Sequence, residues 1–256
     1  MGITAWVRRD LPEQVPVAVE ATPTPNAENA QVAAVAKATP ATASQEAEIS
    51  SLPPPVVEPG HAASNNRVAQ LDWPSLQQAV QDCQACELHK TRLNPVFGIG
   101  DPRARWMIVG EAPGVEEDKR GQPFVGKAGK LLDAMLQAVG LNRQTVFIAN
   151  ILKCRPPNNR DPQAHEIDAC STFLQRQIEL IQPELILAVG RYAAQTLLQS
   201  NEPIGKLRGQ VSKHLASGIP VVATYHPAYL LRQPGEKRKS WEDLKLAMTV
   251  SNPSNK

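Results

Sequence analysis

The sequence predicts a three-layer α/β/α domain with a central four-stranded, mainly parallel sheet. Short apolar runs with the length and composition of strands alternate along the chain with longer segments of helical periodicity. Such alternation is typical of strands that are joined by crossover helices and therefore run parallel. The folded region, of about 190 residues, is long enough to bury one core. The expected strands are Trp106–Val109, Val146–Ala149, Leu185–Val189 and Pro220–Ala223.

The expected helices precede and separate these strands. Trp73-Pro74-Ser75, followed by apolar residues at Leu76 and Val80, predicts a capped amphipathic helix that ends at a C-x2-C pair. The other helices are expected at about residues 127–139, 163–181, 190–200 and 236–248.

The N-terminal part of the chain has a different composition. Residues 10–65 are rich in Ala, Pro, Thr and Glu and contain no aromatic residue. Such a segment buries too little apolar surface to offset its ordering entropy, so we expect a disordered extension over residues 1–65. The folded domain is expected over 66–250, with a tail at 251–256.

The first nine residues combine apolar side chains with two arginines. Ile3, Trp6 and Val7 precede Arg8-Arg9, a combination that suits a short peptide docking on another protein; a start without function is the alternative. This tip, residues 1–9, resembles the N-terminal peptide of the psi subunit of bacterial DNA polymerase III. The resemblance implies a replication or repair protein as its partner.

Charge and hydropathy indicate the kind of partner and the compartment. Residues 1–65 carry three Lys or Arg against seven Asp or Glu, whereas residues 66–256 carry 24 against 18. A basic folded part suits a polyanionic partner. No apolar run approaches the length of a membrane span, and the N-terminus lacks the apolar core of a secretory signal. We therefore expect a soluble cytoplasmic protein, as a monomer.

The sequence contains four cysteines, at positions 83, 86, 154 and 170. In a cytoplasmic protein, cysteines are more often metal ligands or catalysts than disulfides. Four thiolates suit an iron–sulfur cluster, but zinc accepts the same ligands, and scattered buried thiols are a third interpretation. A non-catalytic nucleic-acid-binding module with a four-cysteine zinc site is therefore the alternative function.

Unusual segments follow the predicted strands, where active sites of open α/β sheets gather. The first strand leads into the turn 110–114, GEAPG, and then into 121–129, GQPFVGKAG. The turn lacks the Gly-Lys-Ser/Thr ending of a phosphate loop. The second strand leads into 150–162, NILKCRPPNNRDP, and the last into 226–232, HPAYLLR.

Together with the four cysteines, these segments strongly resemble the family 4 uracil-DNA glycosylases, the iron–sulfur-containing type. The resemblance covers residues 73–248. It implies an enzyme that flips uracil out of DNA and hydrolyses its N-glycosidic bond, leaving an abasic site that starts base excision repair. It also implies a structural [4Fe-4S] cluster that is bound by Cys83, Cys86, Cys154 and Cys170.

The resemblance assigns roles to three residues around the base. Phe124 stacks on uracil, unless its ring belongs to the ordinary core. The amide of Asn150 accepts from uracil N3–H and donates to O4, whereas cytosine presents the opposite pattern. The alternative is that Asn150 is a turn residue at the strand end and caps the backbone. His226 donates to O2 as negative charge develops there, although a lone histidine before proline is often structural.

Two acidic residues complete the predicted pocket. Glu111 orders the pocket or its water, and Glu117 lies beside uracil C5, where it excludes the methyl group of thymine. The alternative for Glu117 is one solvated acid in an acidic run. Family 1 enzymes carry an aspartate that assists the attacking water where this chain has Ala112, so we expect leaving-group stabilisation to dominate the rate.

DNA contacts are predicted just after the His226 segment, at Arg232, Lys237, Arg238 and Lys239. Tyr229, Leu230 or Leu231 is expected to wedge into the gap that the flipped nucleotide leaves. A solvated basic helix start is the alternative for the basic cluster. Further basic residues that could line the groove are Lys119, Arg120, Arg155 and Arg160.

Overall fold

The structure, a computed structural model, describes residues 67–251. The predictions for residues 1–65, including the docking tip at 1–9, lie outside the described residues. So does the predicted tail beyond Ser251, the residue at which the last helix ends.

The sheet contains the four predicted strands at its centre, where neighbours run parallel. Each begins where the sequence predicts, and three extend one residue further. They are β2 (Trp106–Gly110), β3 (Val146–Asn150), β4 (Leu185–Val189) and β6 (Pro220–Thr224). Their residues are almost all buried, as is typical of a parallel sheet that helices cover on both faces.

The expectation of four strands was too low, because the sheet has six in the order β1-β3-β2-β4-β6-β5. The two additional strands, β1 (Ile99–Gly100) and β5 (Val211–Lys213), pair antiparallel at the edges. Neither carries a buried apolar run, so no apolar pattern marks these strands in the sequence. Short strands of this kind are a common way to end a sheet.

All five predicted helices are present. They are α2 (Trp73–Gln81), α4 (Lys127–Ala138), α5 (Ala164–Ile181), α6 (Arg191–Leu198) and α9 (Lys237–Ser251). The cap of α2 is Asp72, whose carboxylate accepts from the backbone N–H of Ser75 over 3.0 Å. Shorter elements are α3 (Val115–Arg120), α7 (Ile204–Leu207), α8 (Pro227–Arg232), η2 (Glu87–Lys90), η3 (Pro157–Asn159) and η4 (Pro234–Glu236).

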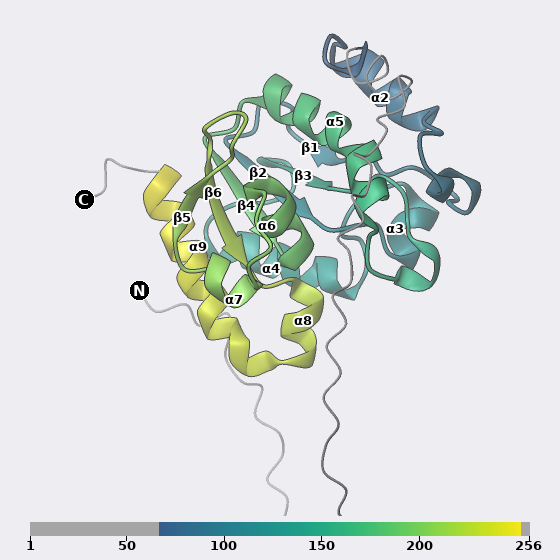
Figure 1. The fold of residues 1–256 in the computed structure, drawn as a ribbon. Helices are drawn as coiled ribbons and strands as arrows, with labels where there is room; N and C mark the ends of the chain where they lie inside the picture. The colour runs from purple at the N-terminus through teal and green to yellow at the C-terminus, as the bar shows by residue number, and fades with distance from the viewer. Residues whose placement is uncertain (1–66, 252–256) are drawn as a thin grey trace, which may run out of the picture. The chain divides into compact units, whose positions relative to one another are not determined.

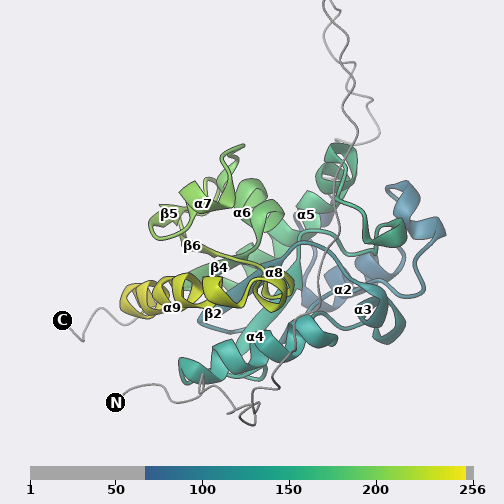
Figure 2. The ribbon, with the colours of Figure 1, turned by 90° about the horizontal axis from the view of Figure 1, so that it is seen from below.

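The helices form two layers, one on each side of the sheet. Figure 1 shows the sheet at the centre, and Figure 2 shows α5, α6 and α7 on one side with α4, α8 and α9 on the other. The three-layer α/β/α prediction is therefore confirmed. Among residues 67–251, no helix is long and apolar enough to cross a membrane.

The strand order places a functional site at one end of the sheet. From β2 the chain moves outward to β3, returns past β2 to β4, and continues to β6. The order therefore reverses between β2 and β4. Ligands of open α/β sheets bind outside the carboxyl ends of strands at such a reversal.

Candidate active site

A pocket of about 240 Å³ lies beyond the carboxyl ends of β2, β3 and β6. It brings together all five residues that were predicted to surround the base, namely Glu111, Glu117, Phe124, Asn150 and His226. Asn159 and Arg160 also line it. A larger hollow of about 340 Å³, against α5 and α6, contains none of the predicted site residues.

Asn150 is the last residue of β3, and its side chain is 1% exposed. Its Oδ1 atom is buried and has no hydrogen-bond partner among the described residues. An unpartnered buried polar atom costs on the order of 1–3 kcal/mol. Such an atom beside a pocket indicates a ligand that supplies the missing donor.

The amide of Asn150 fits because its neighbour on β2 is Gly110. A Cβ atom at Gly110 would lie 2.5 Å from Oδ1 of Asn150 and 2.5 Å from the ring of Phe124. The absence of a side chain at this position therefore allows the amide and the ring to converge.

Phe124 forms one wall of the pocket and is 6% exposed. Its ring centroid lies 5.6 Å from that of His226, with 30° between the ring planes. The backbone of Phe124 has φ of 53°, a left-handed conformation that is uncommon for a residue with a side chain. The surrounding structure must hold it there.

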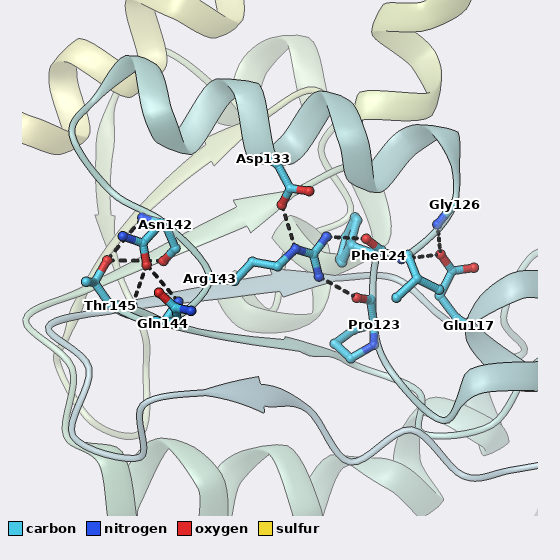
Figure 3. Close-up of polar contacts among 10 residues, drawn as sticks. Glu117, Pro123, Phe124, Gly126, Asp133, Asn142, Arg143, Gln144 and Thr145 are labelled. Atoms are coloured by element: carbon cyan, nitrogen blue, oxygen red, sulfur yellow. Dashed lines mark hydrogen bonds and ion pairs between the residues drawn. The ribbon is translucent and has the colours of Figure 1, made fainter.

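Arg143 provides that restraint (Figure 3). Its guanidinium donates to the carbonyl oxygen of Phe124 and, over 3.0 Å, to that of Pro123. Its Nε lies 2.6 Å from Oδ1 of Asp133 on α4. Arg143 was not among the predicted site residues, because nothing in its local sequence pattern indicates that it contacts a loop about twenty residues earlier.

Glu117 connects the turn 110–114 to the Phe124 loop. Its carboxylate accepts from the backbone N–H groups of Gly114 at 3.1 Å, Val125 at 2.8 Å and Gly126 at 2.9 Å. The alternative of a solvated acid is therefore wrong for Glu117. It is also wrong for its neighbour Asp118, which is buried and accepts from the N–H of Leu93.

His226 precedes α8 and lines the pocket together with Phe124. Its Nδ1 accepts from the N–H of Ala228 over 3.1 Å. Burial lowers the pKa of His226 to about 4, and the nearby Arg232 guanidinium lowers it too. The imidazole is therefore neutral at pH 7. Gly190 makes room for it, because a Cβ there would lie 3.1 Å from the His226 Cβ.

Glu111 follows β2 at the point where the strand order reverses. The pKa of Glu111 is raised to about 7, mainly by burial and also by the nearby negative charge of Asp161, against the lowering effect of Arg191. Arg191 and Asp161 form an ion pair with 3.1 Å between Nη2 and Oδ2. Glu111 can therefore gain or lose a proton near neutral pH, as a group that handles a water molecule requires.

The four cysteines line one small cavity. Cys83 and Cys86 lie between α2 and η2 and are half-buried, whereas Cys154 and Cys170 are buried. The pKa of Cys170 is raised to about 12, mainly by burial and also by the neighbouring Cys154 and Cys86. Four thiols from three separate segments thus share one site, and scattered buried thiols are excluded.

The donor set of this cavity suits a group bound by thiolates. Nη1 of Arg92 donates to Sγ of Cys154 over 3.0 Å and lowers the pKa of that thiol against the stronger effect of burial. Although the four thiols share this cavity, no three His, Cys, Asp or Glu side chains in the described part of the chain are close enough together to hold a single metal ion.

Comparison with known proteins agrees with this geometry. A sequence model of the Uracil DNA glycosylase superfamily matches residues 97–245. The chain belongs to the uracil-DNA glycosylase superfamily. Its resemblance to family 4 is also confirmed by curated relatives.

Two of these relatives are named type-4 uracil-DNA glycosylase. The protein from Archaeoglobus fulgidus is 44% identical over 172 residues, which are 65% of this chain and 86% of that protein. The protein from Saccharolobus solfataricus is 47% identical over 173 residues, 65% of this chain and 80% of that protein. A type-5 uracil-DNA glycosylase from Pyrobaculum aerophilum is 33% identical over 153 residues, 53% of this chain and 66% of that protein.

The basic residues follow β6 in the sequence. They were predicted to contact DNA. Arg232 is exposed at the end of α8. Arg238 forms an ion pair with Glu242 at 3.2 Å, and Lys239 with Glu236 at 2.8 Å. Arg238 and Lys239 therefore have acidic partners nearby, and the binding of phosphates by the four predicted contacts stays a prediction.

The structure also narrows the choice of a wedge residue in this glycosylase. Leu230 is fully buried, so it cannot enter DNA, whereas Leu231 is 45% exposed. Arg160 was predicted to line the DNA groove. Both of its terminal nitrogens bond to the carboxylate of buried Glu166, at 2.5 and 2.9 Å, so it fixes the pocket wall to α5, and its contact with DNA stays a prediction.

Proposed function

We propose that the chain receives a flipped-out uracil in this pocket and hydrolyses its N-glycosidic bond, leaving an abasic site that starts base excision repair. The observation that carries the proposal is the buried Oδ1 of Asn150 without a partner, in one pocket with the ring of Phe124 and the imidazole of His226. Uracil supplies what these groups lack: an aromatic face, an N3–H donor and two carbonyl oxygens.

Asn150 accounts for the choice of uracil over cytosine. Its Oδ1 accepts from N3–H, and its amide NH2 donates to O4. Cytosine has an acceptor at N3 and a donor at the other position, so it would leave the buried amide unpaired on both sides. A site that is built to pair with a substrate N–H rejects analogues lacking it by large factors.

Glu117 accounts for the exclusion of thymine. Three backbone N–H groups hold its carboxylate in the pocket wall, so the side chain cannot move aside without losing these bonds. A fixed side chain beside C5 leaves no room for the methyl group of thymine, whereas a mobile side chain could move and admit it.

His226 stabilises the departing base. Water adds to C1′ of the sugar, and the electron pair of the C1′–N1 bond leaves with uracil, whose O2 becomes negative. The neutral imidazole has its acceptor Nδ1 bonded to Ala228, so its Nε2–H is the donor for O2. One such donor typically contributes about 10²–10³ in rate.

Glu111 positions the attacking water. With a pKa of about 7 it is partly ionised at neutral pH and can accept a hydrogen bond or a proton from the water. Ala112 leaves no second carboxylate in this turn. We therefore assign the larger share of the rate to the leaving group and the smaller share to Glu111.

We assign the four-cysteine cavity to a [4Fe-4S] cluster. Cys83, Cys86, Cys154 and Cys170 would bind it, with Arg92 donating to the sulfur of Cys154. When bound, the cluster would cross-link the α2–η2 connection, α5 and the segment after β3, without redox chemistry. The alternative of a non-catalytic module with a zinc site is not favoured, because it leaves the pocket unexplained.

Uracil-containing DNA is the proposed partner, single- or double-stranded. The replication or repair protein that binds residues 1–9, the monomeric state and the cytoplasmic location stay predictions from the sequence.

The test is an assay with a labelled oligonucleotide that contains one uracil. Purified full-length protein is incubated with it in EDTA, and abasic sites are then cleaved with alkali. Matched strands carry thymine or cytosine at the same position, and His226→Ala protein controls for contaminating activity. Cleavage of the uracil strand alone is expected. An intact uracil strand after treatment with iron-loaded protein would refute the proposal.

A further inference from the structure

We infer that Lys153 is a positioning residue that connects the four-cysteine cavity to the base-reading amide of Asn150. The inference rests on the proposed function, because it concerns the same pocket. It adds a residue that touches neither the base nor the sugar.

Lys153 is 2% exposed, which is rare for a lysine. Its Nζ donates to two buried oxygens, the backbone carbonyl of Asn150 at 2.8 Å and Oε1 of Gln177 at 2.7 Å. Both partners are uncharged, and the negative charges near Lys153 are those of the Cys154 and Cys170 thiolates. A buried donor of this kind is retained only where its hydrogen bonds are made.

These two bonds join separate parts of the site. Lys153 lines the small cavity together with Cys154 and Cys170. Gln177 follows Cys170 on α5 by seven residues, about two helical turns, so the two side chains lie on the same face of the helix. Nε2 of Gln177 donates in turn to the carbonyl of Phe97 over 2.9 Å. Lys153 therefore lies beside Cys154 and Cys170 and at the same time contacts the end of β3.

The backbone at Asn150 is fixed on its other side by β2. Beyond the last residue of β3, the N–H of Ile151 donates to the carbonyl of Gly110 and that of Leu152 to the carbonyl of Glu111, both at 3.0 Å. The ammonium group of Lys153, at the end of the segment 150–153, donates a hydrogen bond to the carbonyl of Asn150 at its start. The direction of the Asn150 side chain follows from the backbone that Lys153 holds.

The experiment compares Lys153→Met with the wild type. Methionine has nearly the same length but cannot donate, so the carbonyl of Asn150 loses a partner. We expect kcat/KM on a uracil oligonucleotide to fall at least about tenfold, and the inhibition constant of free uracil to rise in parallel. Iron per chain should be unchanged. Free-uracil inhibition is measured well below the melting temperature, so a merely structural role would not alter it.

Two further variants complete the design. Lys206→Met removes an exposed lysine that pairs with Glu202 on the surface, and it should leave all three readouts unchanged. The double variant Lys153→Met with Gln177→Leu removes Nζ and its acceptor Oε1 together, so no unpaired side-chain acceptor is left at position 177, and the carbonyls of Asn150 and Phe97 lose one donor each. It therefore serves where the single variant fails to fold or to retain iron.

The outcomes separate this inference from the proposed function. If the wild type does not cleave the uracil strand, the proposed function fails. If the wild type is active, an iron-loaded double variant with weakened uracil inhibition supports the role of Lys153. An iron-loaded double variant with inhibition within twofold of the wild type overturns it. A double variant without iron also overturns it, because Lys153 would then serve the cysteine site alone.

Discussion

The backbone N–H of Ala228 donates to Nδ1 of His226 over 3.1 Å. The intervening residue, Pro227, has no N–H, so Ala228 offers the first free donor of α8. Because Nδ1 accepts this bond, the neutral imidazole carries its proton on Nε2. The His-Pro-Ala sequence thus begins a helix and fixes the tautomer that the proposed chemistry needs.

The half-buried, neutral imidazole of His226 should make the free energy of unfolding fall in acid. The pKa of His226 is about 4 in the folded protein, below its ordinary value of about 6.5, so the unfolded chain binds a proton first. Protonation of this histidine therefore leaves the free energy of unfolding unchanged above pH 6.5 and lowers it progressively as the pH falls towards 4. Between pH 7 and 4.5 the wild type should lose roughly 2–3 kcal/mol more than His226→Asn. Urea unfolding at both pH values measures this, and equal losses would contradict it.

The pH–rate profile should report Glu111. With a pKa of about 7, this carboxylate is protonated in mild acid, so kcat/KM should fall below neutral pH with a slope near one. Glu111→Gln should lower the plateau by on the order of 10² and abolish this acidic limb. If the variant keeps both the plateau and the limb, another group handles the water.

Gly110→Ala should reduce activity much more than stability. The added methyl group would meet the amide of Asn150 and the ring of Phe124, each at 2.5 Å, and must displace one of them. We expect the free energy of unfolding to fall by about 1–3 kcal/mol and uracil cleavage to be lost. Gly205→Ala on α7 is the matched control, since nothing lies within 4 Å of its Cβ, and it should retain full activity.

Asn150→Asp should abolish uracil reading without unfolding the protein. An ionised carboxylate accepts from N3–H but repels O4, so kcat/KM should fall by at least about 10². Circular dichroism and the iron content should match those of the wild type. Loss of iron in this variant would instead place Asn150 in the support of the cysteine site.

Cys170→Ser should remove the bound group and loosen the domain. Without one buried ligand we expect loss of visible absorbance and iron, and a decrease in Tm of about 4–8 °C, equivalent to about 2 kcal/mol. Ser171→Ala changes the next, exposed residue of α5 and should alter neither property. A Cys170→Ser protein with full iron content would remove this cysteine from the ligand set.

The sequence predicted the centre of the fold from local patterns, whereas the members of the pocket were predicted from the resemblance to family 4. The strands β2, β3, β4 and β6 are continuous apolar runs, and the polar residues at their ends gather at one edge of the sheet. The edge strands β1 and β5 escaped, since they are short and lack a buried face.

The supports of the pocket could not be predicted, because they depend on contacts between distant segments. Arg143 reaches back to the carbonyl of Phe124, and Lys153 reaches Gln177 across 24 positions. A lysine beside a cysteine in a basic segment indicates a solvated charge, and only the packing of α5 against that segment shows otherwise.

The hydrogen bonds of Glu117 affect which partner rearranges when DNA binds. Its carboxylate closes three backbone N–H groups into one rigid frame, so the protein walls of the pocket are complete before a nucleotide arrives. The rearrangement on binding then falls mainly on the DNA, which must unstack and unpair the base. A uracil in a mismatch or in a single strand should therefore enter faster than one paired with adenine.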